Sequence, residues 1–453
     1  MFKRILIANR GEIALRIIRC CREMGIETVL IYSTADKESL PVQLATYPIC
    51  IGPAHAKKSY LNQEAIIDLA KRMECEAVHP GYGFLSENAG FARKCEENGL
   101  IFIGPSSEII DKMGDKQSAR TLMRENGVPV VPGSKELVSD ADEAKRIADE
   151  IGYPVLIKAS AGGGGRGMRK AFDADEIENA FNTARAEAES AFGNGDMYIE
   201  KLILKPRHIE FQILGDKFGN IVHLGERDCS IQRRNQKMIE ESPSRALSEK
   251  LRTEMGEAAI KAARAADYYS AGTVEFVLDG EGRFYFIEMN TRIQVEHPVT
   301  ELVSGVDLVR EQIRIAAGLK LRFEQKDVVL RGHAIECRIN AENPLDGFKP
   351  TPGKIDFLHL PAGNGVRVET AVYPGYEISP FYDSMVAKII VHASGRLEAI
   401  RKMRCALEEL MIEGIITNER FDYIMLYHPE FIRGNYNTSF LEEHMDELLE
   451  WSR

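Results

Sequence analysis

Apolar positions follow two different periods over the first 110 residues or so. Residues 5–8 form a short apolar run, residues 11–24 carry apolar side chains three or four positions apart, and residues 28–32 are rich in β-branched side chains. A strand, a helix closed by Gly25 and a second strand are therefore predicted. This order requires a right-handed crossover between parallel strands, so a parallel sheet is expected at the start of the chain.

The turn after the first strand argues against a dinucleotide site. Such a site needs Gly-x-Gly-x-x-Gly at that point, whereas this chain reads Ala8-Asn-Arg-Gly-Glu12. An NAD-binding interpretation therefore lacks its phosphate cradle.

A second segment begins near Asp115, which is a candidate N-cap for a helix over residues 116–126. Farther on, residues 153–203 predict an inserted lid that contains a strand, a glycine-rich loop, a second strand and a helix. From about residue 331 the pattern mixes strands with a last pair of amphipathic helices. We expect about two to four domains from this length and these changes of pattern.

The predicted lid helix carries signals at both of its ends. Asp173 and Glu176 have capping-box spacing, so the helix is expected to begin directly after Asp173. Gly193-Asn-Gly195 offers a hinge back to the body. The apolar positions between these ends fit a helical period: Ile177, Ala180, Phe181, Ala184, Ala188 and Ala191.

Composition narrows the class of protein. The chain has 453 residues and a net charge of −11, which argues against a general nucleic-acid binder. None of its eight cysteines forms a C-x-x-C pair, so neither zinc nor a disulfide is expected. The chain starts without a secretory pattern, and its apolar runs stay well short of the ~20 residues that span a membrane. We expect a soluble, cytoplasmic protein.

The run Gly162-Gly-Gly-Gly-Arg-Gly167 contains a formal dinucleotide fingerprint, but it precedes a strand and opens no helix. The Walker pattern is absent too. Because so many glycines are costly to order, a loop that orders over phosphate groups explains them, and a disordered surface loop is the alternative. Lys158, at the end of an apolar strand, favours phosphate binding.

The turn Asp279-Gly-Glu-Gly282 lies between two strand-like runs and predicts a β-hairpin. If Leu278 pairs with Arg283, Glu275 lies opposite Phe286. One face of the hairpin then becomes unusually acidic.

That face places Glu275 diagonal to Glu288, with Asn290 on the same side. Two ionised carboxylates whose tips approach to about 5 Å repel each other by roughly 3 kcal/mol, so such a pair needs a proton, an arginine or a divalent cation. Oxygen ligands of this kind suit Mg²⁺. Salt-bridged carboxylates of an ordinary sheet are the alternative.

The two-residue spacing continues through Arg292, Gln294 and Glu296. A straight strand would separate Glu288 from Glu296 by roughly 27 Å. The chain must therefore bend, and we expect the bend near Gln294. An arginine and a carboxylate that converge on a small anion can hold its charge and remove its proton.

Two further polar groups are weaker signals. Lys237 ends a basic stretch that contains Arg233 and Arg234, for which a solvated loop is the alternative. His208 alternates with Glu210 on one face of a predicted strand, where a structural histidine is the default interpretation.

Five stretches of this chain resemble the biotin carboxylase family, which includes a subunit of bacterial acetyl-CoA carboxylase and the N-terminal region of pyruvate carboxylase. The resemblance covers essentially the whole chain, and the last two stretches are the most specific. The five are Ile7-Ala-Asn-Arg-Gly-Glu-Ile13, His79-Pro-Gly-Tyr-Gly-Phe-Leu-Ser-Glu-Asn88, Lys158-Ala-Ser-Ala-Gly-Gly-Gly-Gly-Arg-Gly-Met168, Arg227-Asp-Cys-Ser-Ile-Gln-Arg-Arg234 and Glu288-Met-Asn-Thr-Arg-Ile-Gln-Val-Glu-His-Pro298.

The resemblance implies a role for each matched position. The ATP phosphates would be contacted by Lys116, Lys158, Gly164, Gly165 and His208. The adenine would be framed by Glu200, Lys201 and Ile203, with Gln232 nearby. Mg²⁺ or Mn²⁺ would be held by Glu275, Glu288 and Asn290. Bicarbonate would be bound by Lys237, Arg292, Gln294 and the Val295 backbone, with Glu296 as its base. The biotin enolate would be stabilised by Arg338, and the ureido pocket would be lined by Tyr82.

By the same resemblance, the reaction is carboxylation of biotin with ATP and bicarbonate through carboxyphosphate. The chain has neither a Met-Lys-Met biotinylation tripeptide nor room for a carboxyltransferase domain. The biotin carboxyl carrier protein and the carboxyltransferase subunits are therefore expected on other chains. Acetyl-CoA carboxylase, and with it fatty acid biosynthesis, is the expected holoenzyme, and the corresponding subunit of pyruvate carboxylase is the alternative.

The implied fold is a doubly wound N-terminal domain over residues 1–114, an ATP-grasp domain over 115–330 and a β-rich C-terminal domain over 331–446. A mobile lid would occupy about residues 131–203, and the assembly would be a homodimer. Asn235 departs from the family pattern, because histidine is common there, although an amide can also hydrogen-bond a nucleotide.

Two alternatives stay open. Another ATP-grasp ligase, such as a carbamoyl-phosphate synthetase fragment or a purine-pathway enzyme, would share the ATP-binding residues. A non-catalytic nucleotide sensor would be expected to lack Glu288, Arg292 or Glu296, and this chain has all three.

Overall fold

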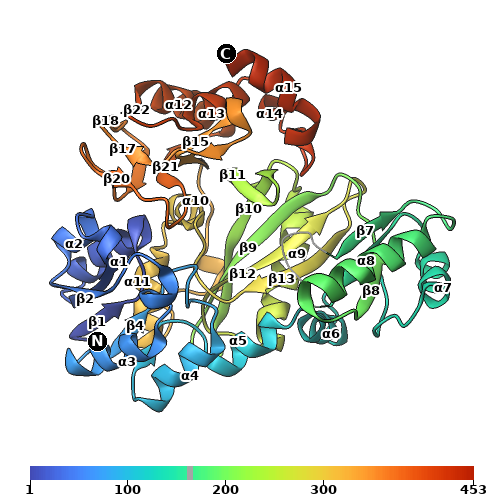
Figure 1. Ribbon diagram of the computed structural model, residues 1–453, viewed down its shortest axis with the longest axis horizontal. Helices are drawn as coiled ribbons and strands as arrows, with labels where there is room; N and C mark the ends of the chain where they lie inside the picture. The colour runs from blue at the N-terminus through green and yellow to red at the C-terminus, as the bar shows by residue number, and fades with distance from the viewer. Residues whose placement is uncertain (161–166, 453) are drawn as a thin grey trace.

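The structure is a computed structural model that describes residues 1–160 and 167–452 (Figure 1). Gly164 and Gly165, which were predicted to contact phosphate, lie outside the described residues. In the described part, no helix is both long and apolar enough to cross a lipid bilayer.

The N-terminal sheet is parallel, as predicted. Its strands, in spatial order, are β3 (Tyr47–Gly52), β2 (Glu27–Ser33), β1 (Arg4–Ile7), β4 (Ala77–His79) and β5 (Ile101–Phe102). The helices of this segment are α1 (Gly11–Glu23), α2 (Leu40–Leu44), α3 (Gln63–Arg72), α4 (Ala89–Glu97) and α5 (Ser107–Gly114).

Both faces of the parallel sheet are covered. Ile5 and Ile7 of β1 belong to the same buried cluster as Ile17 of α1. Leu6, which points the other way, clusters with Phe91 of α4. Because successive strand residues face opposite sides, helices pack on both faces, and the predicted doubly wound arrangement is confirmed.

An antiparallel sheet of eight strands forms the centre of the molecule (Figure 1). In spatial order its strands are β13 (Phe284–Asn290), β12 (Ser270–Leu278), β9 (Arg207–Gly215), β10 (Ile221–Arg233), β11 (Gln236–Ser242), β14 (His333–Asn340), β21 (Met385–Ala393) and β19 (Val366–Thr370). The last three strands follow residue 330 and the first five precede it, so one sheet continues across the predicted domain boundary. Helices next to these strands in sequence are α6 (Lys116–Glu125), α9 (Glu249–Ala265), α10 (His297–Ser304) and α11 (Leu308–Ala316).

The lid is a three-stranded antiparallel sheet with two helices. Its elements are β7 (Met168–Ala171), β6 (Val155–Ala159), β8 (Met197–Lys201), α7 (Ala141–Ile151) and α8 (Ile177–Phe192). The lid helix begins later than predicted, at Ile177, because Asp173 and Glu176 instead close a turn before it. Asp173 Oδ1 accepts the backbone N–H of Glu176, and Glu176 Oε2 accepts that of Phe172. Ala191, predicted on the apolar stripe, is exposed.

The C-terminal segment ends in four helices rather than the predicted pair. They are α12 (Arg396–Glu409), α13 (Glu419–Met425), α14 (Pro429–Arg433) and α15 (Phe440–Ser452). Three small sheets pair β15 (Glu342–Asn343) with β16 (Lys349–Pro350), β17 (Gly353–Lys354) with β20 (Glu377–Ile378), and β18 (Phe357–His359) with β22 (Met411–Glu413).

Candidate active site

A cleft of about 1320 Å³ opens between the central sheet, the lid and the C-terminal strands. It is lined by every predicted site residue that the structure describes. These are Tyr82, Lys116, Lys158, Glu200, Lys201, Ile203, His208, Gln232, Asn235, Lys237, Glu275, Glu288, Asn290, Arg292, Gln294, Val295, Glu296 and Arg338.

At one end of the cleft, Glu275 lies directly opposite Glu288 on the β12–β13 hairpin. The predicted register was wrong, because Asp279 accepts the backbone N–H of Arg283 and so includes Arg283 in the turn. Leu278 consequently pairs with Phe284, and an irregularity next to Glu275 shifts the pairing once more. The predicted shared face is nevertheless present.

The two carboxylates have different surroundings. Glu275 is buried, and its Oε1 accepts the amide N–H groups of Asn290 and Gln294, each at 2.8 Å. Glu288 is more exposed and lies 3.1 Å from Lys116 Nζ. Two carboxylates and one amide oxygen form the kind of donor set that suits Mg²⁺. Asn290 Oδ1 accepts a hydrogen bond from Arg292 at 2.9 Å, and its second lone pair is available for that set.

The chain bends earlier than predicted. Strand β13 ends at Asn290, well before Gln294, and Glu296 is already the N-cap of α10. Glu87 accounts for the position of the bend, because its carboxylate accepts the Thr291 backbone N–H at 3.0 Å and Arg292 Nε at 2.9 Å. This bend brings Arg292 and Glu296 into the same cleft as the carboxylate pair.

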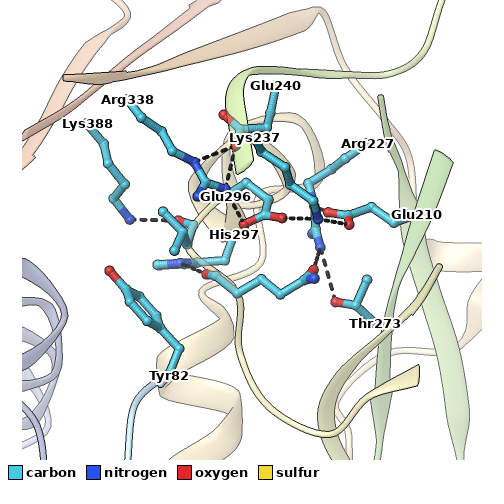
Figure 2. Close-up of polar contacts among 12 residues, drawn as sticks. Tyr82, Glu210, Arg227, Lys237, Glu240, Thr273, Glu296, His297, Arg338 and Lys388 are labelled. Atoms are coloured by element: carbon cyan, nitrogen blue, oxygen red, sulfur yellow. Dashed lines mark hydrogen bonds and ion pairs between the residues drawn. The ribbon is translucent and has the colours of Figure 1, made fainter. Parts of the chain in front are cut away.

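The centre of the site is a buried group of charges around Glu296 (Figure 2). Lys237 Nζ lies 2.6 Å from Glu296 Oε1, 2.5 Å from Glu210 Oε2 and 3.3 Å from Glu275 Oε1. Arg338 Nη2 donates to Glu296 Oε2 at 3.0 Å. Burial alone would raise the pKa of Glu296, but Lys237, Arg338 and Arg227 hold it below its ordinary value. Glu296 is therefore an ionised carboxylate in contact with two cations, and the ionised state is the one in which a carboxylate can accept a proton.

A second group of charges lies where the lid borders the cleft, the part that the family resemblance assigns to the nucleotide and that is called the nucleotide end below. Glu200 forms ion pairs with Lys158 across the lid sheet and with Arg120 Nη1 at 3.1 Å. Lys201 Nζ donates to the backbone carbonyls of Gly152 and Tyr153. These contacts fix the two lid side chains, and the basic groups face a cleft that can receive phosphates.

His208 lines the same cleft, and its Nε2 lies 2.9 Å from Oε2 of Glu275 in the carboxylate pair. Burial would lower its pKa, but Glu275 and Glu210 raise the pKa to about 9. The imidazole is consequently a cation at neutral pH, which suits a phosphate contact better than the structural role that the strand pattern indicated by default.

Family models match three successive stretches of the chain. They are "Biotin carboxylase, N-terminal domain" at residues 1–110, "Carbamoyl-phosphate synthase L chain, ATP binding domain" at residues 115–324 and "Biotin carboxylase C-terminal domain" at residues 336–443. The chain is also 56% identical over 443 residues to biotin carboxylase 1 of Bacillus subtilis, with 98% of both chains covered. The chain belongs to the biotin carboxylase family.

Other members of the biotin carboxylase family are comparably similar. A pyruvate carboxylase subunit from Methanothermobacter thermautotrophicus is 54% identical over 444 residues, which cover 98% of this chain and 90% of the relative. The biotin carboxylase domain dimer of Hydrogenobacter thermophilus 2-oxoglutarate carboxylase, solved with MgADP, ADP and bicarbonate, superposes with a TM-score of 0.92 at 52% identity, covering 99% of both chains. Biotin carboxylase of Campylobacter jejuni, solved with β-γ-ATP, gives a TM-score of 0.93 at 51% identity, covering 98% of this chain and 99% of its own.

Membership of the biotin carboxylase family confirms several predictions. The chain is an ATP-dependent ligase that carboxylates biotin, with ATP and Mg²⁺ as the family's cofactors, on the predicted ATP-grasp fold. The resemblance to carbamoyl-phosphate synthetase is explained, because the family model of that name matches residues 115–324, and biotin carboxylase models match the segments on either side.

Sequence reasoning missed Arg227, which is fully buried at the centre of the biotin carboxylase site (Figure 2). Its guanidinium donates to five groups: Glu210 Oε1 at 2.5 Å, Gln212 Oε1 at 2.7 Å, Thr300 Oγ1 at 2.9 Å, Thr273 Oγ1 at 3.1 Å and Gln294 Oε1 at 2.5 Å. Arg227 thus orients the Gln294 amide toward Glu275. The sequence does show that Arg227 is a charged residue within the stretch that forms the long strand β10. It does not show the partners of Arg227, because they come from distant parts of the chain.

Proposed function

We propose that this chain carboxylates biotin on a separate carrier protein, using ATP and bicarbonate, in the first half-reaction of a biotin-dependent carboxylase. The observation that carries the proposal is the position of Lys237. Its ammonium contacts Glu275, which belongs to the proposed Mg²⁺ and ATP site (the nucleotide end). It also contacts Glu296, which belongs to the proposed bicarbonate site (the anion end). A phosphate and a small anion bound at these two ends would meet next to one cation and one base.

Each end has a defined task in this proposal. Lys116, Lys158 and His208 bind the ATP phosphates, and Glu200, Lys201, Ile203, Gln232 and Asn235 line the nucleotide end. Glu275, Glu288 and Asn290 would hold Mg²⁺, which would neutralise phosphate charge. Arg292, Lys237, Gln294 and the Val295 backbone bind bicarbonate.

The chemistry then follows from Glu296. Glu296 accepts the bicarbonate proton, the freed oxygen attacks the γ-phosphorus, and ADP leaves with the electrons of the broken P–O bond. The carboxyphosphate formed breaks at its C–O bond into CO2 and phosphate. The phosphate takes the N1′ proton of biotin, and N1′ attacks CO2 to form carboxybiotin.

The bound anion must displace part of the present ion-pair network. Glu296 now accepts from Lys237 and Arg338, whereas a bicarbonate would share those cations. Arg338 then becomes available to stabilise the enolate that biotin forms on losing its proton. Tyr82, at the same cleft, would line the ureido pocket.

The proteins that bind this chain determine which biotin-dependent carboxylase it belongs to. We propose acetyl-CoA carboxylase in the cytoplasm, with a biotin carboxyl carrier protein, carboxyltransferase subunits and a homodimer of this chain. Relatives that serve as subunits of pyruvate and 2-oxoglutarate carboxylases share the same fold, so the final acceptor is set outside this chain. Isolation of the native complex, followed by identification of its carrier and transferase, tests the assignment.

The experiment for the half-reaction itself uses the isolated chain. We expect ATP turnover that depends on both bicarbonate and free biotin, with carboxybiotin as product. Turnover that continued at the same rate without biotin, or the formation of carbamoyl phosphate from ammonia, would refute the proposal.

A further inference from the structure

Lys388 is a fully buried lysine behind the anion end of the cleft. It lies on β21, opposite Arg338 of β14, and Figure 2 shows it reaching toward the centre of the site from the side of the C-terminal strands. An unpaired ammonium is costly to bury, so its partners explain its presence.

The ammonium of Lys388 joins two segments that are far apart in sequence. Nζ donates to the backbone carbonyl of Val295 at 2.7 Å and lies 3.1 Å from Glu12 Oε1. The same Glu12 oxygen accepts the hydroxyl of Tyr82, which lines the cleft. Among the described residues, the other oxygen of Glu12 is buried without a hydrogen-bond partner.

The Val295 carbonyl belongs to the peptide that leads into Glu296. The preceding peptide is held as well, because His297 Nδ1 lies 2.8 Å from the Gln294 carbonyl. With both peptides fixed, the Val295 N–H and the Glu296 side chain have a defined direction. Lys388 therefore acts on the anion end through backbone and does not itself line the cleft.

We propose that Lys388 is a positioning residue for the reaction: it sets the Val295–Glu296 peptide against bicarbonate and, through Glu12, couples that peptide to Tyr82 at the biotin end. The inference rests on the proposed bicarbonate site. It assigns Lys388 and Glu12 a role that is separate from nucleotide binding, since within the described part of the chain neither side chain forms a hydrogen bond or ion pair with the lid or the carboxylate pair.

Steady-state kinetics of Lys388→Met test this role. We expect the KM for bicarbonate to rise at least about tenfold and kcat to fall, because a hydrogen bond from a charged group is lost, while the KM for ATP stays within twofold. Lys388→Arg should restore part of the loss, since a guanidinium can still donate to both oxygens. Lys402→Met is the matched control, because Lys402 also donates to a β21 carbonyl, that of His392 at 2.8 Å, but away from the cleft.

Loss of the ammonium leaves Glu12 as a buried charge without its ion pair, which would lower the stability of the protein. This effect on stability must be distinguished from the proposed effect on bicarbonate binding. The double variant Lys388→Met/Glu12→Gln removes both charges and should regain thermal stability without regaining bicarbonate affinity. A folded Lys388 variant with an unchanged bicarbonate KM, or one whose ATP KM rises equally, would overturn the inference. Arg292→Ala is measured in parallel: if it too leaves bicarbonate kinetics unchanged, the proposed anion site itself is wrong.

Discussion

Lys237 and Glu296 lie 2.6 Å apart in the cleft although 59 positions separate them in the chain. Lys237 comes from β11, and Glu296 is the N-cap of the helix that follows the bend after β13. Lys237 also contacts Glu275, which belongs to the proposed Mg²⁺ site. A change of charge next to Glu296 therefore alters the electrostatic surroundings of Glu275 through Lys237.

Arg292→Ala should leave nucleotide binding nearly intact and remove most biotin carboxylation. Arg292 contacts Glu87 and Asn290 and lies at the anion end, so its loss removes a cation that holds developing charge. We expect a decrease in kcat/KM for bicarbonate of about 10²-fold or more. Nucleotide affinity from calorimetry and carboxybiotin formation are measured together. Arg283→Ala, at the exposed tip of the same hairpin, is the control, and a parent-like rate in Arg292→Ala would contradict the role.

Glu288→Gln should raise the Mg²⁺ concentration needed for half-maximal ATP turnover and slow phosphoryl transfer. The substitution keeps the shape but removes one of the two facing carboxylates, and it frees Lys116 from its ion pair. Titration of activity with Mg²⁺ at saturating ATP checks this. Glu281→Gln, in the exposed turn of the hairpin, should titrate like the parent. Identical titrations for both variants would remove Glu288 from the metal site.

Arg227→Met should destabilise the protein strongly. Among the described residues, the change leaves the buried Glu210 with Lys237 and His208 as its ionic partners. It also leaves four neutral acceptors without their Arg227 donor. Breaking a buried ion pair costs about 3–5 kcal/mol. Thermal unfolding measures the effect, with Arg185→Met in the exposed part of the lid as the control. Equal melting temperatures in the two variants would show that the Arg227 network is not needed for stability.

His208 should make stability depend on pH in a defined interval. Its folded pKa of about 9 exceeds the unfolded value of about 6.5, so the charged form stabilises the folded state. That contribution is complete below about pH 6.5 and is lost as the pH rises through about 9.

In His208→Gln the melting temperature should therefore vary less between pH 6.5 and 9 than in the parent. His223→Gln is the control, because burial lowers the pKa of His223 to about 4 and keeps it neutral over that interval. A parent-like slope in His208→Gln would show that His208 is not the titrating group.

The part of the site that sequence could predict lies close together in the chain. Glu288 and Asn290 share a face because they are alternate residues of one strand. Glu275 joins them because the two one-residue shifts of register, at the tip and next to Glu275, add up to two residues and so restore the predicted face. The error in register arose at the tip, where Asp279 binds backbone N–H groups, and such side-chain contacts leave little trace in a hydrophobic pattern.

The part that sequence could not predict depends on long-range pairing. Lys388 is the one lysine of strand β21, whose other residues are apolar apart from one histidine. Such a lysine indicates a buried partner, but the strand pattern does not identify that partner. Its partners, Val295 and Glu12, come from the bend and from the N-terminal segment. The early bend after Asn290 likewise follows from Glu87, about two hundred positions away, which no local pattern could identify.

The most direct test of the two-ended site follows oxygen from bicarbonate. With ¹⁸O-labelled bicarbonate, ATP and biotin, mass spectrometry of the released phosphate should find one bicarbonate oxygen in each phosphate, because that oxygen attacks the γ-phosphorus and stays bound to it when CO2 leaves. Glu296→Gln should form this labelled phosphate far more slowly. Phosphate that carries no label in the parent enzyme would mean that water attacks ATP, and would contradict a shared site for the nucleotide and the anion.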